Sequence, residues 1–434
     1  MKISFYKRFK VLIRKKYNEV GIGISNAYIG FTVIWALNIS TIYRSYWAGD
    51  DWPNSQTPYW IEWRFGELNN SSIWSEAMFW NDQWMRGAGR FYPFSWIESR
   101  FIFSYFQELW QYKTYQFALL FIAGILFVYV CYLLSKSHLL CVIVLASLSL
   151  TVQFRRDFDP HLAFSAMLPS LLIKIMISII FAFRSGKSNG SIGGIIWSLL
   201  AGIFYFSAMS TYEFGFLLFP MLFIAFVLGV QQNAKLNADL SNKSYSKYLL
   251  ISTRFHPIFL SWIGYAIFVF GYLRPKALEV SGAYVIDFSL SSFRVLFSQI
   301  FSGIPLISFR RIDFNLTFTT VLVLVILLLV ATISLRNLFN EVQKKSNTEN
   351  LISNKSQNNK TLEILTLIFA LNMIFAPGFM MSIQPVWWEQ ASFTKSYLGV
   401  MITEFGTSLF IAIILRALII RNTIRVTMQV KRKS

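Results

Sequence analysis

The chain has 434 residues, of which 55% are hydrophobic and only 14% are charged, and its formal net charge is +19. A soluble protein of this length needs far more polar surface, so the composition excludes an ordinary soluble globular fold. The basic residues are spread over short connections between apolar segments, which is the distribution that membrane topology produces. Nucleic acid is therefore not an expected partner, whereas a lipid bilayer is.

Apolar segments close to the ~20 residues that cross a bilayer recur along the whole sequence. Each is expected to be a helix, because backbone groups in lipid must be hydrogen-bonded within the segment. We therefore predict an all-α polytopic membrane protein with one integral membrane domain over residues 1–434. Its ten expected spans cover residues 26–46, 116–134, 139–154, 162–183, 192–210, 213–230, 257–273, 317–335, 362–383 and 397–420.

The distribution of basic residues predicts the orientation of these spans. With ten spans both termini lie on the same side of the membrane, and that side collects 24 of the 40 Lys and Arg residues but only five acids. Positively charged loops stay in the cytoplasm during insertion, so both termini are expected to be cytoplasmic. The sequence predicts a multi-pass protein of the cell inner membrane.

The connections on the opposite side are very unequal in length. Residues 47–115 form a long outer loop that holds nine of the fourteen tryptophans and is predicted to contain helices lying along the membrane surface. Interfacial anchoring is the expected role of most of these indole rings, and stacking on sugar rings is the alternative. A second long outer loop covers residues 274–316; its apolar "VLFSQIFSGIPLISF" is too short to span and could be re-entrant or interfacial. Residues 336–361 read as a polar cytoplasmic linker.

Two adjacent carboxylates follow the first span, in "YWAGDDWP", residues 46–53. The side chains of Asp50 and Asp51 must point in different directions, so they are not expected to do the same job. In one interpretation Asp51 caps a surface helix that Trp52 and Pro53 enter. In the other, one carboxylate is a general base, and partial desolvation beside the membrane raises its pKa towards neutrality. The residues alone leave both interpretations open.

A second polar cluster lies in the short outer turn between the third and fourth spans, in "QFRRDFDPHLAF", residues 153–164. Its ionisable residues are Arg155, Arg156, Asp157, Asp159 and His161. Such a density of charge beside a membrane is costly unless the groups pair or bind a ligand. One interpretation is a knot of Arg–Asp salt bridges. The other is a site in which an arginine binds phosphate and the two aspartates, together with the histidine, bind a hard cation.

Four further charged residues are candidates for the site, and two of them, Glu213 and Arg274, could face the same cavity. Arg90 follows small residues in "MRGAGRFYPF", which is compatible with the close approach of a ligand. Glu213 and Arg274 are expected at the outer ends of their spans. Glu404 falls within the outer part of the last span, where an acid needs a partner or water.

The two acidic motifs together resemble those of the GT-C superfamily of polytopic glycosyltransferases. Its members carry an acidic residue just after the first span, in a long loop with surface helices, and often an Asp-x-Asp-like motif between spans three and four. Asp50 and Asp51 match the first position, and Asp157 and Asp159 match the second. The succession "GDDW … GRFYPF" is similar to bacterial O-antigen-modifying glucosyltransferases of the Gtr type. The resemblance covers the first four spans, and the later half only by topology.

This resemblance implies a sugar donor carried on a polyprenyl phosphate and a glycan acceptor, such as O-antigen or another surface polysaccharide, at the periplasmic or exterior face. Asp50 or Asp51 would take the proton of the acceptor hydroxyl as it attacks the anomeric carbon, with inversion. Substrate and phosphate would be bound by Arg90, Arg155, Arg156, Arg274 and His161. A divalent cation, Mg²⁺ or Mn²⁺, at Asp157 and Asp159 is left open, because a monophosphate donor needs a metal less than a pyrophosphate donor does.

Two other functions compete with this one. An O-antigen or polysaccharide polymerase would also have large outer loops, but it would depend more on outer arginines than on paired acids. A lipid-linked-sugar flippase or other transporter would place ionisable residues near mid-membrane and show internal repeats, and the sequence favours neither feature. There is no Walker loop, dinucleotide fingerprint or HExxH motif, which disfavours an ATP-driven pump or a membrane metalloprotease.

Overall fold

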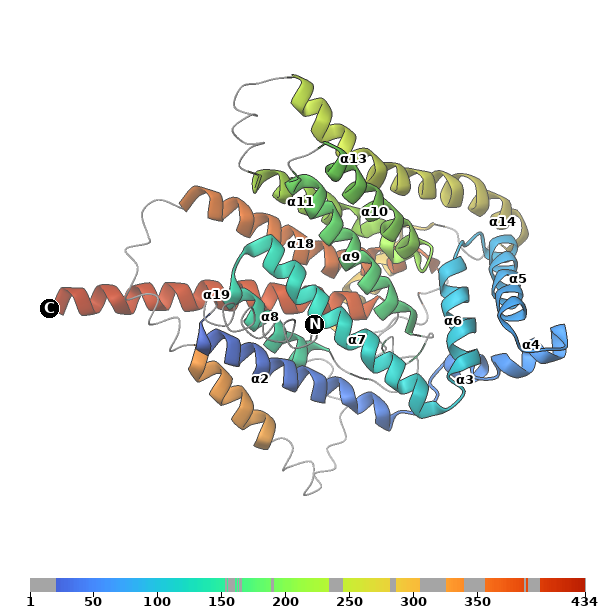
Figure 1. Ribbon diagram of the computed structural model, residues 1–434, viewed down its shortest axis with the longest axis horizontal. Coiled ribbons are helices and arrows are strands. Elements are labelled where there is room, and N and C mark those ends of the chain that lie inside the picture. The colour runs from blue at the N-terminus through green and yellow to red at the C-terminus, as the bar shows by residue number, and fades with distance from the viewer. Residues whose placement is uncertain are drawn as a thin grey trace, which may run out of the picture.

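The structure is a computed structural model of the chain. It describes residues 21–152, 154, 161, 163, 166–188, 191–233, 245–281, 286–304, 325–338, 356–385, 388 and 399–433. Within these residues all regular secondary structure is helical and no strand occurs (Figure 1). The predicted all-α class is confirmed for this part of the chain.

In the described part of the chain, eight helices are long and apolar enough to cross a membrane. They are Ile22–Arg44, Leu109–Ser135, Met167–Lys187, Ile192–Met209, Glu213–Gln231, Thr253–Ala277, Leu362–Ser382 and Val400–Arg421. Each overlaps one of the predicted spans. The other two predicted spans overlap shorter apolar helices, His138–Thr151 and Val325–Leu338. A polytopic helical membrane protein is therefore supported, and the number of ten crossings stays a prediction.

The main helices form a bundle of parallel and antiparallel neighbours, in which α18 and α19 run in opposite directions (Figure 1). They are α2 (Ile22–Ile39), α7 (Leu109–Ser135), α8 (His138–Thr151), α9 (Met167–Lys187), α10 (Ser191–Met209), α11 (Phe219–Gln231), α13 (Tyr245–Ala266), α18 (Ser356–Ser382) and α19 (Val400–Lys433). Helix α9 packs against α10 and α11, and α19 packs against α8 and α18. The first residue of α2 and the last residue of α19 lie at the same end of the bundle (Figure 1).

Helices α9 and α11 pack so closely at Gly186 and Gly229 that neither position has room for a side chain. A Cβ on Gly186 would lie 2.2 Å from the carbonyl oxygen of Phe226, and a Cβ on Gly229 would lie 2.2 Å from that of Phe183. Small residues at such contacts are typical of membrane helix pairs, because lipid offers no hydrophobic driving force between helices and close packing must hold them together. A side chain at either glycine would push the two helices apart.

Large apolar side chains also cover the outside of the bundle. Ile192 is 73% exposed, Ile203 is 62% exposed and Leu418 is 48% exposed. A soluble monomer rarely exposes a continuous apolar surface of this kind. These side chains are in the position where lipid tails would contact a membrane-spanning bundle.

The predicted outer loop at residues 47–115 is largely helical and lies at one end of the bundle. Its helices are α3 (Asp51–Asn54), α4 (Thr57–Phe65), α5 (Asn70–Ala88) and α6 (Pro93–Tyr105), preceded by the 3₁₀ helix η1 (Ser40–Arg44). Helices α5 and α6 run across the bundle near the beginning of α7 (Figure 1). The segment "SSIWSEAMFWNDQWMRG" forms α5 as predicted, begun by a capping box between Asn69 and Ser72. We call this end of the molecule the α3–α6 end; its contact with a membrane surface stays a prediction.

The second predicted outer loop contains α14 (Arg274–Ser281) and α15 (Leu290–Ser302). Helix α15 packs against α18 and α19. Its apolar face points outward, with Phe293 61% and Phe297 49% exposed, whereas Ser292 and Ser298 are buried. This inverted pattern suits a helix at a lipid surface. The choice between an interfacial and a re-entrant segment stays a prediction. Most of the predicted linker at residues 336–361 lies outside the described residues.

Candidate functional site at the α3–α6 end

The two adjacent aspartates lie where the chain turns from η1 into α3. Gly49 makes this turn with a φ of 54°, a left-handed conformation that costs glycine little. Helix α3 begins at Asp51, so Asp50 holds the N-cap position, and its side chain makes no capping hydrogen bond. The predicted short helix is present, but Asp51 does not cap it. Its carboxylate is engaged elsewhere.

Asp51 is fully buried and accepts hydrogen bonds from the first turns of α7. Tyr112 donates its Oη–H to Asp51 Oδ2 at 2.6 Å, and Gln116 Nε2 donates to the same oxygen at 3.4 Å. Lys113, 1% exposed, donates from Nζ to Gln116 Oε1 at 3.1 Å and supplies a positive charge to the network. A buried carboxylate needs such partners, because desolvation without them is costly.

Aromatic rings close this network from the side of η1 and α6. The ring of Trp47 stacks on Tyr112 with 5.1 Å between centroids, and Phe103 stacks on Tyr112 at 4.8 Å. These rings exclude water, and hydrogen bonds in a dry environment are electrostatically stronger than those exposed to solvent. Asp51 is therefore a fixed part of the protein interior.

Asp50 has the opposite environment. Its side chain is exposed, and its neighbours Tyr46 and Trp52 are also exposed, at 72% and 63%. Nearby protein still removes part of the hydration of the carboxylate, and this desolvation raises the pKa of Asp50 above its ordinary value. Asp50 is accordingly a reachable carboxylate and a stronger base than an aspartate in water.

Two of the predicted phosphate-binding arginines meet at one buried glutamate. Arg274 Nη2 donates to Glu213 Oε2 at 2.8 Å, and Arg90 Nε donates to Glu213 Oε1 at 3.4 Å. All three side chains are at most 5% exposed. The structure brings Arg90, Glu213 and Arg274 together in one ion-paired cluster, which we call the Glu213 triad. That they line a substrate cavity stays a prediction.

The small residues before Arg90 serve the assembly of this triad. A Cβ on Gly89 would lie 2.7 Å from Cα of Arg274, and Gly89 has a φ of 61°. The close approach expected at this position is therefore made by the backbone of α14. In this structure Gly89 brings α14 onto the end of α5, which places Arg274 beside Glu213.

Arg100 is a buried cation that the sequence did not single out. Its Nη1 donates to Thr57 Oγ1 at 2.8 Å and to Asn54 Oδ1 at 3.0 Å, and its guanidinium lies over the rings of Trp80 and Trp96. Burial lowers the pKa of Arg100 to about 10, so the side chain is still charged at neutral pH. Arg100 thereby ties α6 to the end of α3, a few residues after Asp50.

A further polar cluster, also missed in the sequence, joins α6 to the beginning of α9. Ser170 donates to Glu98 Oε2 at 2.6 Å. Lys174 Nζ pairs with the carboxylate of Glu98 and donates to Thr211 Oγ1 at 2.6 Å. The base of the helical loop is thus fastened to the bundle by an ion pair as well as by apolar contacts.

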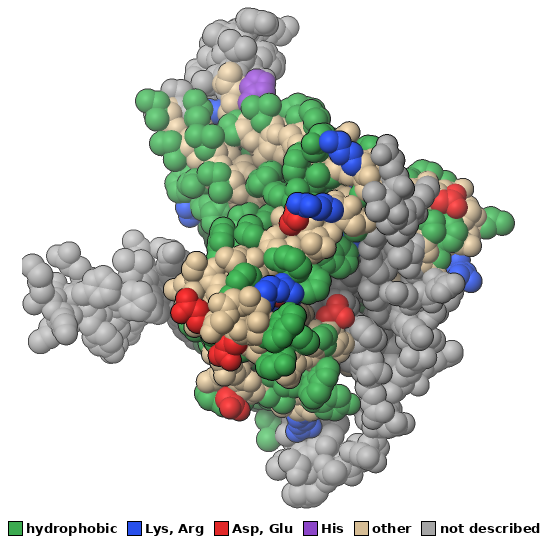
Figure 2. Space-filling model, turned by 90° about the vertical axis from the view of Figure 1, so that its right-hand side faces the viewer, with side chains coloured by type: hydrophobic (Ala, Val, Ile, Leu, Met, Phe, Trp, Pro, Cys, Tyr) green, Lys and Arg blue, Asp and Glu red, His purple; other side chains and the backbone are tan. Residues whose placement is uncertain are grey.

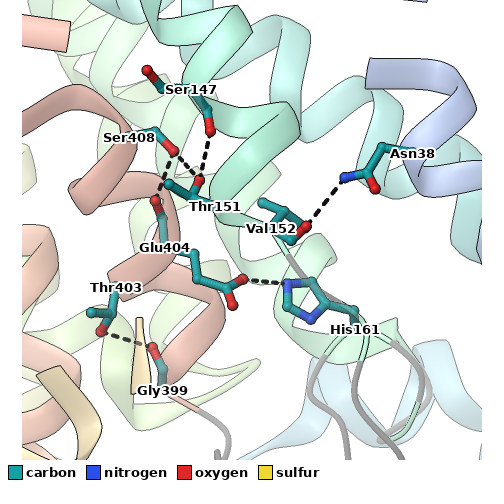
Figure 3. Close-up of polar contacts among 9 residues, drawn as sticks. All are labelled: Asn38, Ser147, Thr151, Val152, His161, Gly399, Thr403, Glu404 and Ser408. Carbon is teal, nitrogen blue, oxygen red and sulfur yellow. Dashed lines mark hydrogen bonds and ion pairs between the residues drawn. The ribbon is translucent and has the colours of Figure 1, made fainter. Parts of the chain in front are cut away.

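His161 and Glu404 form a buried pair at the same end (Figure 3). Glu404 Oε2 lies 3.0 Å from His161 Nε2, and each side chain is 1% exposed. The pair links the segment after α8 to the first turns of α19, where Ser408 donates to the backbone oxygen of Glu404 at 2.8 Å. The prediction that Glu404 requires a partner is confirmed, and that partner is His161.

The remaining members of the second motif lie outside the described residues: Arg155, Arg156, Asp157 and Asp159. Their predicted roles in binding phosphate and a divalent cation therefore stay predictions. Among the residues that the structure describes, no three His, Cys, Asp or Glu side chains are grouped to hold a metal ion.

Apart from the exposed Asp50, the predicted site residues that the structure describes belong to three separate clusters at one end of the bundle. Asp51 joins α3 to α7, the Glu213 triad joins the end of α5 to α14, and His161 joins the segment after α8 to α19. Sequence reasoning missed Tyr112, Lys113 and Gln116. These three polar residues lie within the first turns of an otherwise apolar helix, and that pattern could have identified them. No family model, no curated protein and no solved structure matches this chain.

Proposed function

We propose that this protein is a membrane glycosyltransferase that moves a sugar from a polyprenyl phosphate to a hydroxyl of a surface glycan, with Asp50 as the general base. The observation that carries the proposal is the division of labour between two adjacent carboxylates. Asp51 is buried and hydrogen-bonded to Tyr112, whereas Asp50 is exposed and its pKa is raised. One acid is held by the protein, and the other is available to a substrate.

In the proposed reaction Asp50 takes the proton of the acceptor hydroxyl. The hydroxyl oxygen forms a bond to the anomeric carbon while the bond from that carbon to the phosphate oxygen breaks, and the polyprenyl phosphate leaves with the electron pair. A single displacement of this kind inverts the anomeric centre. A raised pKa suits this role, because general bases work best when their pKa is close to the ambient pH.

Asp51 is a positioning residue in this scheme. The turn that carries Asp50 is held on one side by the bond from Tyr112 to Asp51 and on the other by the bonds from Arg100 to Asn54 and Thr57. A base held on both sides loses little entropy when it meets its substrate, and such pre-organisation is a large part of enzymatic rate enhancement.

The Glu213 triad supports the same proposal through its charge. Two arginines share one carboxylate, so the triad carries one net positive charge when all three groups are ionised. Excess positive charge in a poorly hydrated place attracts anions, and the departing group here is a phosphate monoester. Because Arg90 and Arg274 are buried, direct contact with phosphate requires this ion pair network to open. Arg155 and Arg156 remain predicted phosphate ligands as well.

The decisive experiment measures surface glycan mass in cells that express single variants at equal protein level. Asp50→Asn should lower glycan modification by about 10²–10⁴-fold, the usual contribution of a general base. Asp50→Glu should keep part of the activity, because it keeps the carboxylate. Asp82→Asn is the matched control, an exposed acid of the same end that pairs with Arg86.

Wild-type glycan from Asp50→Asn at normal protein level would refute the assignment of the base. A transporter would give a different result: the purified protein would move a lipid-linked sugar or another solute across the membrane of proteoliposomes, and glycan mass would not change. That result would favour the transporter over the enzyme.

A further inference from the structure

A cavity of about 390 Å³ lies at the end of the bundle opposite the α3–α6 end. It is formed by the turn between α7 and α8 and by the facing sides of α18 and α19. Its volume lies within the ~300–1,000 Å³ that are usual for small-molecule sites. Nothing in the proposed glycosyl transfer uses this cavity.

The cavity lies at the level where a membrane changes from hydrocarbon to headgroups. Leu362, on its wall, is the first residue of one candidate span, and Arg421, at its rim, is the last residue of another. This end of the bundle collects the basic connections that predict a cytoplasmic location. The cavity is therefore placed at the headgroup region of the cytoplasmic leaflet.

The polar side of the cavity has an excess of positive charge. Arg416 Nη1 pairs with Glu363 Oε1 at 2.9 Å, and Arg421 adds a second guanidinium. Two arginines and one carboxylate line the cavity, which leaves one positive charge when all are ionised. In addition, Arg416 Nε is buried and has no hydrogen-bond partner among the described residues. A buried donor without an acceptor is unfavourable, so the site has both the charge and the donor to receive an anion.

The other side of the cavity is apolar. Leu140, Leu362 and Ile413 line it. Arg421 at the rim is exposed, so the polar side is reachable from outside the bundle. A ligand that satisfies both sides needs one negative charge with oxygen acceptors and an attached apolar chain. A phosphodiester on an acyl chain has these properties, and arginine binds phosphate oxygens through two parallel N–H groups.

We propose that this cavity binds the headgroup phosphate of an anionic phospholipid from the cytoplasmic leaflet, with Arg416 and Arg421 as its ligands. Basic pockets between membrane helices on the cytoplasmic side are a known form of lipid recognition. The site does not involve the carboxylates at the other end, so it can be tested independently of the proposed enzymatic function.

The test is native mass spectrometry of the full-length protein in detergent, titrated with dioleoyl phosphatidylglycerol, dioleoyl phosphatidylcholine or inorganic phosphate. We expect the anionic lipid to be retained in preference to the zwitterionic one. Arg416→Gln or Arg421→Gln should weaken this retention about fivefold, and the double variant about thirtyfold. Arg416→Lys should keep only part of it, because the charge remains but the paired N–H groups of the guanidinium are lost.

Arg184→Gln is the matched control, because Arg184 lies at the same end on α9, over the ring of Trp197 and away from the cavity. Elution as a monodisperse peak shows that each variant is folded. Equal retention of the two lipids by the wild type, or an equal loss in Arg184→Gln and Arg416→Gln, would overturn the proposal. If inorganic phosphate binds as tightly as the anionic lipid, the site is one for a free anion and not for a lipid.

Discussion

The two ends of the bundle differ in how deeply their charged side chains are buried. At the α3–α6 end, acids and bases are buried together, as in the Glu213 triad and in the network of Asp51 and Lys113. At the other end, Glu363 is the one acid whose side chain the structure describes, and it lies 52% exposed beside Arg416. Figure 2 shows acidic and basic side chains interspersed with apolar ones across the α3–α6 end.

Charged side chains have two different roles in a membrane protein, and the two ends illustrate one each. Exposed cations cost little and orient the chain in the membrane, so they need no partner. Buried pairs are expensive, because each group loses its hydration, and such pairs in membrane proteins usually serve a function. Among the described residues, buried acid–base pairs lie at the α3–α6 end only, whereas the buried Arg254 of the other end donates to a backbone oxygen, that of Ser188. We therefore place the chemistry at the α3–α6 end and a lipid contact at the other.

The comparison is tested most directly by removing one carboxylate from each end. Glu213→Gln leaves two buried guanidinium groups without their carboxylate, and we expect a loss of ~3–5 kcal/mol in the free energy of unfolding. Glu363→Gln removes the acid of an exposed pair, which should cost ~0–1 kcal/mol. Unfolding in detergent with increasing denaturant, followed by circular dichroism, measures both. Similar losses at the two ends would contradict the distinction.

A smaller effect is expected from the hydrogen bond that holds Asp51. Tyr112→Phe removes the donor at 2.6 Å and leaves a buried carboxylate with fewer bonds, which should cost ~1.5–3 kcal/mol. The control is Tyr43→Phe, which removes an exposed bond to Thr114 on the same helix and should change stability by less than ~0.5 kcal/mol. If the two variants unfold at the same denaturant concentration, Asp51 does not depend on α7 as the geometry indicates.

Much of the fold could be predicted because it depends on local pattern. Eight apolar runs became helices of spanning length, and the mixed segment around Trp80 and Trp84 became α5. The third predicted span became a shorter helix, α8, which ends at Thr151. The sequence shows apolar length well, but it does not show at which residue a helix ends.

The candidate site was less predictable because its partners are far apart in the chain. Glu213 and Arg90 are separated by 123 residues, and Tyr112 lies 61 residues from Asp51. No local periodicity connects such residues, so the sequence could name the charged groups but not their pairing. Gly89 illustrates the limit, since its small size was recognised while the approaching group, the backbone of α14, was not.

The smallest predicted effect compares the adjacent aspartates themselves. The pKa of Asp50 is raised in the folded protein, whereas an aspartate in an unfolded chain titrates near ~3.9. The folded state therefore holds this proton more tightly, and the stability that the proton contributes is present below pH ~3.9 and is lost as the pH rises through the folded pKa. Asp50→Asn does not titrate and escapes this loss.

We accordingly expect Asp50→Asn to match the wild type in thermal unfolding at pH 4 and to become slightly more stable than it towards pH 8. Asp51→Asn should be less stable than the wild type at neutral pH, because the donors on Tyr112 and Gln116 lose an anionic acceptor. A general loss of folding would lower the stability of both variants, so stability changes of opposite sign at these two neighbouring positions would not result from it. A lower melting temperature for Asp50→Asn at neutral pH would mean that the protein stabilises the Asp50 carboxylate, and a stabilised carboxylate is a weaker base than the proposed reaction requires.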